Sequence, residues 1–223
     1  MKAETKDRKW GGMLRRKEVW SLTWRARLLA LGGLIVASWA FMQGIHGFLA
    51  VEAPVGSRVL VIEGWIPEYA LTNLVARHPG FDRIYTTGGP TMTDRHSRDD
   101  SDTYASVAMK RLWRAGVPRD KVRMVPCWVS RRDRTFASAV ALREWCRTND
   151  VVLKDFEVVT LGVHARRSRL LTEKAFPEAR VGVIPALNEE YEPASWWRYS
   201  EGVKEVFSET IAYLYARFLF SPD

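Results

Sequence analysis

Residues 58–63 read RVLVIE and residues 156–161 read FEVVTL, and these two apolar runs decide the fold class. Runs that are continuous rather than alternating are typical of strands buried on both faces of a parallel sheet. Working outward from them, three more strands are predicted at residues 82–87, 121–125 and 180–185.

Stretches with helical periodicity separate these strands and follow the last one. They cover residues 67–77, 100–115, 135–147, 165–175 and 195–220. A regular alternation of strands and helices predicts helices on both faces of the sheet, joined by right-handed crossovers. We therefore expect a three-layer α/β/α domain with a doubly wound, mostly parallel five-stranded sheet, as in Rossmann-like proteins.

The last predicted helix, residues 195–220, is strongly aromatic but also carries charges. These charged residues include Glu201, Lys204, Glu205, Glu209 and Arg217. Their number argues against a second membrane span. We expect this helix to cover the core, and a helix that lies on a membrane surface is the alternative.

An uncharged stretch at residues 28–51, LLALGGLIVASWAFMQGIHGFLAV, predicts one transmembrane helix. At about 1.5 Å per residue it is long enough to cross about 30 Å of hydrocarbon. A cleaved signal peptide is the competing interpretation, but the stretch exceeds the usual apolar core of such a peptide and no A-x-A site follows it. The expected order is a basic tail (1–27), the anchor (28–51), a linker (52–57) and the α/β domain (58–223).

The positive charge of the chain is concentrated before the anchor. Residues 1–51 hold nine Lys and Arg against three acidic residues, a net charge of +6, which leaves +2 of the total of +8 for the remainder. This distribution argues against a nucleic-acid-binding domain. By the positive-inside rule, the N-terminus is cytoplasmic and the domain lies on the far side of the membrane.

Cofactor and metal signatures are weak. Cys127 and Cys146 could pair in an oxidising compartment, but their positions near a predicted strand end and inside a predicted helix give no geometric reason for a disulfide. We favour two unpaired, buried thiols. No spacing of ligands predicts a zinc site. No G-x-G-x-x-G follows residues 58–63, which argues against a nucleotide cofactor, and no other cofactor is predicted.

Ligands of open parallel sheets bind beyond the carboxyl ends of the strands. Four sequence clusters fall at such ends: Glu63-Gly64-Trp65, Thr86-Thr87-Gly88-Gly89, residues 131–135 (RRDRT) and Thr160 to Arg167 (TLGVHARR). Together they would bring arginines, a histidine, glycine amides and two helix N-termini to one crevice. Such a set suits a phosphate, pyrophosphate or carboxylate ligand.

Each cluster also has a purely structural interpretation. Gly88-Gly89 is a common turn, Glu63 could pair with an arginine, and Thr135 could cap a helix. The run 131–134 could be a solvated loop. His164 is the sharpest candidate, because a histidine just after a strand and beside Arg166 and Arg167 is not typical of a core position.

The polar segment 90–101 (PTMTDRHSRDDS) is long for a simple connection. Loops of this kind over a strand-end crevice act as lids or substrate contacts. Asp100, at its end, could supply a carboxylate to the site, or only favour the start of the next helix.

These residues resemble the YdcF/SanA/ElyC family, bacterial envelope domains of unknown function. The likeness runs over about residues 59–184. It consists of the apolar strand ending at Gly64, the turn Thr87-Gly88-Gly89, Asp100 before a helix, Arg134-Thr135 at a helix start, and Val159-Thr160 followed by His164-Ala165-Arg166-Arg167. The family pattern has Ser where Thr87 stands, Asn where Arg134 stands and Glu where Asp100 stands.

The resemblance implies a single-pass protein of the bacterial inner membrane with a periplasmic domain. We expect this domain to bind a phosphorylated or lipid-linked cell-wall or polysaccharide precursor, and to hydrolyse it or transfer from it at a phosphoester. A non-catalytic binding or scaffold module for envelope protein partners is the alternative.

The expected catalytic residues are His164 as general acid or base, and Glu63 or Asp100 to orient it or recruit a divalent ion. The expected ligand-binding residues are Gly64, Thr87, Gly88, Gly89, Arg134, Thr135, Thr160, Arg166 and Arg167.

Overall fold

The computed structural model describes residues 20–77, 80–91, 99–129 and 133–222, and the backbone alone of 8–9 and 14–15. The chain divides into two compact units, Met1–Phe41 and Met42–Asp223. In the first, β1 (Arg8–Lys9) pairs antiparallel with β2 (Leu14–Arg15), a pairing within the basic tail that the sequence did not predict. Helix α1 (Trp24–Leu49) starts in the first unit and ends in the second.

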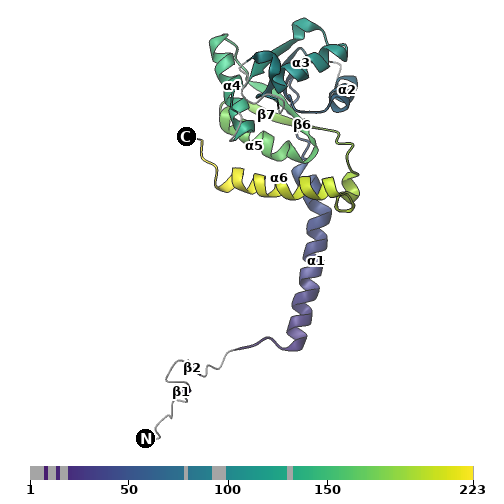
Figure 1. Cartoon of the computed structure of the whole chain (residues 1–223), viewed down its shortest axis with the longest axis vertical. Helices are drawn as coiled ribbons and strands as arrows, with labels where there is room; N and C mark the ends of the chain where they lie inside the picture. Colours follow the sequence, from purple (N-terminus) through teal and green to yellow (C-terminus); the bar gives the residue numbers. More distant parts are fainter. Residues whose placement is uncertain are drawn as a thin grey trace. The chain divides into compact units, whose positions relative to one another are not determined.

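The second unit contains five parallel strands in the order β5-β4-β3-β6-β7 (Figure 1). Their bounds are β3 Val59–Glu63, β4 Arg83–Gly88, β5 Val122–Pro126, β6 Asp155–Leu161 and β7 Arg180–Ala186. The main helices are α2 Glu68–Arg77, α3 Tyr104–Arg114, α4 Arg134–Thr148, α5 Ala165–Ala175 and α6 Ser200–Phe218. This confirms the predicted doubly wound α/β fold, with a sheet that is parallel throughout.

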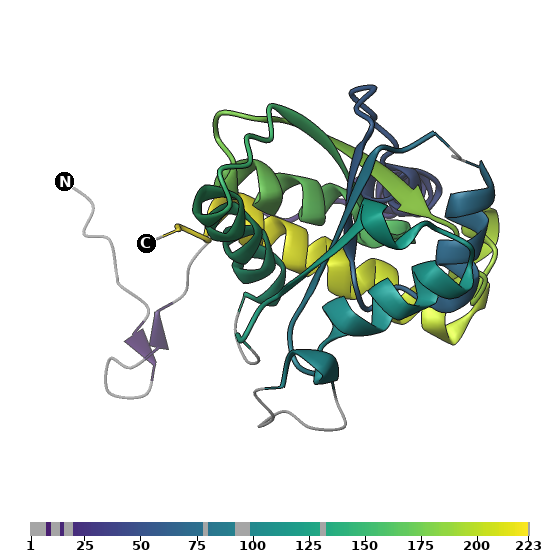
Figure 2. The same ribbon diagram turned by 90° about the horizontal axis from the view of Figure 1, so that it is seen from above.

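Burial of both sheet faces explains why the strands read as unbroken apolar runs. In β3, Leu60 and Ile62 belong to the hydrophobic cluster beneath α2 and α3. Val61 belongs to the cluster on the opposite face, beneath α4 and α5. Successive side chains of a strand point to opposite faces of the sheet. When helices cover both faces, every position of the strand is buried, so its sequence is continuously apolar rather than alternating between apolar and polar residues. Figure 2 shows the helices on the two sides of the twisted sheet.

The C-terminal region departs from the prediction of one helix over residues 195–220. A short 3₁₀ helix, η4 (Pro193–Arg198), comes first, and Tyr199 is extended (φ −118°, ψ 131°) before α6 begins. Trp196 of η4 is buried and donates its Nε1 hydrogen to the carbonyl of Met42, 3.1 Å away. The break therefore lets one indole bridge the C-terminal region to the last turns of α1.

The segment predicted as a linker is an ordered part of the domain. Ala53 forms an antiparallel bridge with Val183 of β7. The backbone amides of Val55 and Ser57 donate to Oε1 of the buried Glu157, at 2.9 and 3.0 Å. These bonds satisfy both amides and fix the path of the chain between α1 and β3.

Helix α1 is the one described helix that is long and apolar enough to cross a membrane, and it spans 26 residues. It begins four residues before the predicted anchor and ends two residues earlier. Ile45 and Leu49 are buried against Trp196 and Val206 in the second unit. The last two turns of the predicted span are therefore packed against the domain.

The two cysteines are confirmed as unpaired and buried. Burial raises the pKa of the Cys146 thiol to about 11, so it stays protonated at neutral pH.

Replacing Gly202 with Ala tests the junction between η4 and α6. Helix propensity alone predicts stabilisation, because Ala is favoured over Gly by about 1 kcal/mol. A Cβ at this position would lie 2.4 Å from the carbonyl oxygen of Trp196, however, and 3.1 Å from the ring of Tyr191. We expect Gly202→Ala to lower the free energy of unfolding by about 1–3 kcal/mol, measured by thermal unfolding in detergent micelles. Gly80→Ala, whose Cβ would contact nothing within 4 Å, is the control, and equal behaviour of the two variants would contradict the packing argument.

Candidate functional site

A cavity of about 360 Å³ lies at the carboxyl ends of the strands. It adjoins the ends of β3 and β4. The strand order reverses direction between β3 and β6, and ligands in this fold usually bind next to such a reversal. Predicted residues from all four sequence clusters line it: Glu63, Thr87, Gly88, Gly89, Arg134, Thr135, His164 and Arg167. The structure thus brings Gly88 and Gly89, Thr135 and His164 to one pocket.

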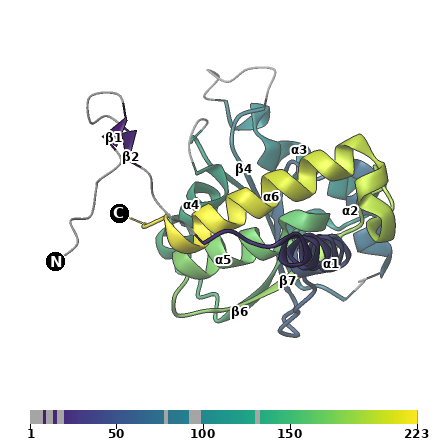
Figure 3. The ribbon, with the colours of Figure 1, turned by 90° about the horizontal axis from the view of Figure 1, so that it is seen from below.

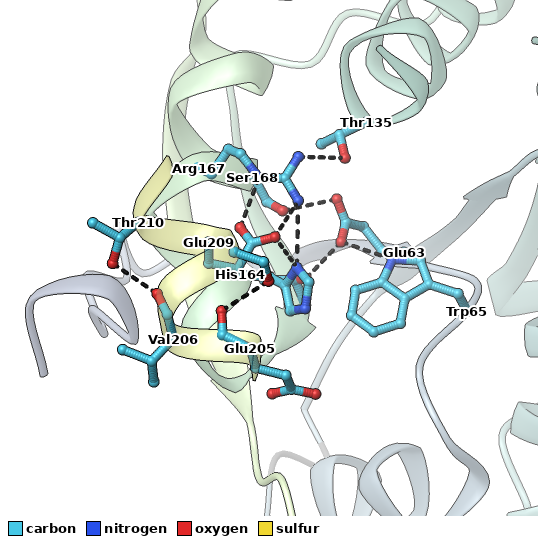
Figure 4. A network of polar contacts seen from close by, with 12 residues as sticks. Glu63, Trp65, Thr135, His164, Arg167, Ser168, Glu205, Val206, Glu209 and Thr210 are labelled. Atoms are coloured by element: carbon cyan, nitrogen blue, oxygen red, sulfur yellow. Dashed lines mark hydrogen bonds and ion pairs between the residues drawn. The ribbon is translucent and has the colours of Figure 1, made fainter. Parts of the chain in front are cut away.

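The centre of the site is a buried carboxylate that was not predicted, Glu209 of α6 (Figure 4). Its Oε1 lies 3.0 Å from Nδ1 of His164. Its two oxygens also accept hydrogen bonds from Nε and Nη2 of Arg167, at 2.7 and 2.9 Å. This two-point geometry is the strong form of an arginine–carboxylate pair.

The position of Glu209 defines the tautomer of His164. Nδ1 lies 3.0 Å from the carboxylate and 3.3 Å from Nη2 of Arg167, which has no acceptor to offer. The carboxylate of Glu209 is the closer neighbour of Nδ1 and the only one that can accept a hydrogen, so we assign the hydrogen of a neutral His164 to Nδ1, which donates it to Glu209. In a neutral imidazole Nε2 is then the basic nitrogen. The ring also meets the indole of Trp65 edge to face, at 4.7 Å between centroids.

The charges of this cluster stabilise each other. Burial by itself raises the pKa of Glu209, but hydrogen bonds from His164 and Arg167 outweigh this and lower it to about 2. Burial likewise acts to lower the pKa of Arg167, and its bonds with Glu209 raise it above the usual value. The carboxylate and the guanidinium therefore stay ionised over the whole physiological range.

Glu63, at the end of β3, is only 9% exposed and is held by three uncharged donors. The hydroxyl of Thr160 donates to its Oε2, the hydroxyl of Ser168 to its Oε1 at 2.9 Å, and Nε1 of Trp65 to its Oε2 at 3.1 Å. Among the ion pairs of the described residues, none joins Glu63 directly to an arginine, but the charge of Glu63 contributes to the raised pKa of Arg167.

The glycines have a packing role as well as a place in the cavity wall. A Cβ on Gly64 would lie 2.3 Å from the carbonyl oxygen of Tyr104, and one on Gly88 would lie 2.8 Å from the Cβ of Tyr104. Gly88 also has φ +146°, which L side chains rarely adopt. Their carbonyls are occupied too, since the amides of Tyr104 and Cys127 donate to Gly89 and Gly88. The glycines let the start of α3 approach the ends of β3 and β4.

The N-terminus of α4 faces the cavity through Arg134, Thr135 and Ser138. The N-cap is Asp133, in the left-handed region at φ 48°, so the interpretation of Thr135 as the cap is wrong. The hydroxyl of Thr135 instead accepts a hydrogen bond from Nη1 of Arg167, at 3.3 Å. The first amides of a helix of this length carry partial positive charge toward the cavity.

Four of the predicted residues lie outside the cavity wall. Gly64 supports the wall from behind, and the buried Thr160 acts through Glu63. Arg166 points away, with its Nε donating to the carbonyl of Phe48 and its guanidinium stacked on that ring. Asp100 is exposed in the 3₁₀ helix η1 (Asp100–Asp102), where its carbonyl accepts from Thr103, the N-cap of α3.

The predicted lid, residues 90–101, lies mostly outside the described residues, because residues 92–98 are not described. Arg131 and Arg132, from the third sequence cluster, are not described either. Within the described part of the chain, no group of three His, Cys, Asp or Glu side chains could hold a metal ion. The two oxygens of Glu63 are already engaged by hydroxyl and indole donors, so the structure gives no support for its expected metal role.

Glu209 was missed because its partners are 42 or more residues away in the chain. A local signal existed. Gly202, Val206, Glu209 and Ala216 are the buried residues of α6, and they recur at spacings of four, three and seven, which place them on one helix face. An acidic residue in such a series is a marker of a buried ion pair.

A second cavity of about 240 Å³ adjoins the first and shares Arg134, Thr135 and Arg167 with it. The other residues that line it are Leu171, Ala212, Tyr215, Ala216, Phe220 and Asp133. The two cavities meet at the same cationic residues, one beside His164 and the other beneath α6.

No protein-family model matches the chain, and a search of curated proteins found no match.

Glu209→Gln tests the ion-pair cluster through its pH dependence. The folded carboxylate titrates near pH 2 and the unfolded one near 4.5, so its stabilisation is complete above pH 4.5 and is lost as pH falls toward 2. We expect the variant to be less stable by about 3 kcal/mol at pH 7, and the difference to shrink below pH 4.5 and vanish near pH 2. Thermal unfolding in micelles between pH 7 and 2 measures this.

The matched control is Glu173→Gln, which removes the partner of Arg169 on the solvent side of α5. Exposed pairs contribute little, so this variant should stay within about 0.5 kcal/mol of the wild type at every pH. A constant offset between Glu209→Gln and the wild type across the pH range would show that Glu209 is not ionised in the folded state.

Proposed function

We propose that this chain is a membrane-anchored protein of the bacterial envelope whose extracytoplasmic domain binds a phosphorylated, lipid-linked cell-wall or polysaccharide precursor. We further propose that it cleaves or transfers a phosphoester of that ligand. The observation that carries the proposal is the orientation of His164 by Glu209 at the wall of a strand-end cavity.

The chemistry follows from the donors around the cavity. In hydrolysis, water adds to phosphorus as the bond between phosphorus and the leaving oxygen breaks. Nε2 of His164 accepts a proton from the water or, when protonated, returns one to the leaving oxygen. Glu209 stabilises the imidazolium that forms between these steps, as the acid of a catalytic triad does.

Charge on the phosphoryl group would be met chiefly by Arg134 and the N-terminus of α4. Arg167 also lines the cavity, but its charge is largely balanced by Glu209, whereas Arg134 is exposed. Helix N-termini and arginines are the usual partners of phosphate groups. This arrangement supports a single phosphoryl group better than a highly charged ligand.

A lipid-linked ligand would find apolar side chains as well as cations in the second cavity. An anionic head held by Arg134 and Arg167 could extend an apolar tail along Leu171, Tyr215 and Phe220. The basic tail, the apolar helix and the family likeness support the proposed membrane and its side. A non-catalytic anchored module that senses the same ligand is the alternative, and the two differ only in whether His164 moves a proton.

The test uses full-length protein in detergent micelles, after mass spectrometry of any copurified ligand, with a short-chain polyprenyl phosphate as probe. We expect the wild type to bind the probe and release inorganic phosphate. His164→Gln keeps a donor toward Glu209 and should retain affinity, but it should lose turnover by at least about 100-fold. Arg134→Ala should raise Kd about tenfold.

Arg169→Ala is the matched control, because Arg169 lies on α5 but pairs with Glu173 away from the cavity. It should change neither affinity nor turnover. Binding without phosphate release in the wild type, with affinity lowered by both cavity variants, would establish the non-catalytic module. Failure of the wild type to bind the probe or to retain any phosphorylated ligand would overturn the proposal.

A further inference from the structure

Helix α6 has an unusual distribution of side chains. Its large apolar residues are exposed, whereas its buried face contains a carboxylate and small residues. The exposed residues are Val203, Phe207, Ile211, Leu214 and Phe218, which we call the outer stripe. A surface helix of a soluble protein normally turns its apolar side to the core, so this helix has the opposite arrangement.

The outer stripe is continuous along the helix. Its members are separated by four, four, three and four residues, the spacing that keeps side chains on one face. Ile211 is 68% exposed and Phe218 is 74% exposed. Contiguous exposed apolar surface of this kind marks contact with a partner or a membrane.

The end of the apolar helix α1 packs beside this surface. Ile45 and Leu49 are buried in one cluster with Val206, which lies on the inner face of α6. Phe48 is 43% exposed and meets Tyr213 of α6 edge to face, with ring centroids 5.5 Å apart. Figure 3 shows α6 crossing the domain beside α5.

Burial along α1 indicates which part of the span packs beside α6. From Arg27 to Phe41 the side chains are exposed, and burial begins at Met42, whose carbonyl accepts the bond from Trp196. The uncharged part of α1 before this point, residues 28–41, is 14 residues long, or about 21 Å at about 1.5 Å per residue. Because Arg25 and Arg27 belong with the headgroups and the hydrocarbon is about 30 Å thick, the last turns of α1, from Met42 to Leu49, are needed to complete the span, and these turns pack beside α6.

Aromatic and basic residues of the same region fit a headgroup layer. Trp197 and Tyr213 are only partly buried where they pack at the end of α1, and such amphipathic rings are enriched at membrane interfaces. Arg217 is exposed on α6 beside the outer stripe, where cations contact lipid phosphates. Lys204 is exposed as well, but its ammonium pairs with Glu201 at 2.8 Å.

We propose that α6 is an interfacial helix that places its outer stripe in the headgroup and upper acyl region of the leaflet from which α1 emerges. The occupant is the lipid surface rather than a second copy of the chain, because the last turns of the anchor bring this face to the bilayer without any further partner. This position rests on the proposed anchor and not on the proposed ligand.

The position has a consequence for the ligand, which does rest on the proposed function. Glu209 lies on the inner face of the same helix, one helix diameter of about 10 Å from the outer stripe. The cavity with His164 would then open close to the headgroups. A lipid-linked phosphate could reach it with its tail still in the membrane.

The experiment places nitroxide spin labels on the full chain in lipid nanodiscs. Single cysteines are introduced by Phe207→Cys, Ile211→Cys and Leu214→Cys, and by Val152→Cys as control. Val152 is 79% exposed and precedes β6 at the amino edge of the sheet. The wild-type chain, in which both native cysteines are buried, measures background labelling.

We expect labels on the outer stripe to collide several-fold more often with oxygen, which concentrates in lipid, than with a water-soluble nickel chelate, and the label at Val152 to show the opposite ratio. Stripe labels as accessible to the nickel chelate as Val152 would overturn the proposal. Stripe labels shielded from both reagents, with dipolar broadening between chains, would also overturn it and identify a second copy as the occupant. None of these outcomes depends on ligand binding or turnover.

Discussion

The bidentate contact between Glu209 and Arg167, extended to His164, is the interaction on which the rest of this domain depends. Glu209 is 5% exposed, and among the ion pairs of the described residues it is the one acid that is buried. An isolated carboxylate at such a depth would cost several kcal/mol, so it is tolerated only because both of its oxygens are paired. The same contact joins α5, which carries Arg167, to the C-terminal helix α6. It also orients the imidazole at the cavity.

A second set of bonds shares the task of holding α6 in place. Glu205, one turn before Glu209, accepts from the amide of Asn188 at 2.9 Å and from the hydroxyl of Tyr191 at 3.2 Å. Burial raises the pKa of Glu205, whereas its neighbour Glu209 is strongly acidic. Two carboxylates on adjacent turns of one face therefore have different environments. Glu209, which is paired with Arg167, is the carboxylate that contacts the candidate catalytic base His164.

Most of the framework was predictable because it follows from local patterns. Unbroken apolar runs identify doubly covered strands, and alternation with helices leads to strand ends that converge on one crevice. The cavity therefore contains most of the predicted site residues, from Glu63 to Arg167. Two features were not predictable in this way. Glu209 finds its partners through long-range packing, and the break at Tyr199 arises where Gly202 meets the carbonyl of Trp196.

The reversed arrangement of α6 also follows from this constraint. A helix that buries Gly202, Glu209 and Ala216 gains little from the hydrophobic effect on that face, because small and charged side chains remove little apolar area from water. Its ion pairs and the contacts of Val206 with the end of α1 must therefore supply much of its attachment. If the outer stripe lies in lipid, as proposed, the bilayer adds the missing apolar contact. The orientation of His164 would then depend on the membrane as well as on Glu209, which couples the geometry of the site to its location.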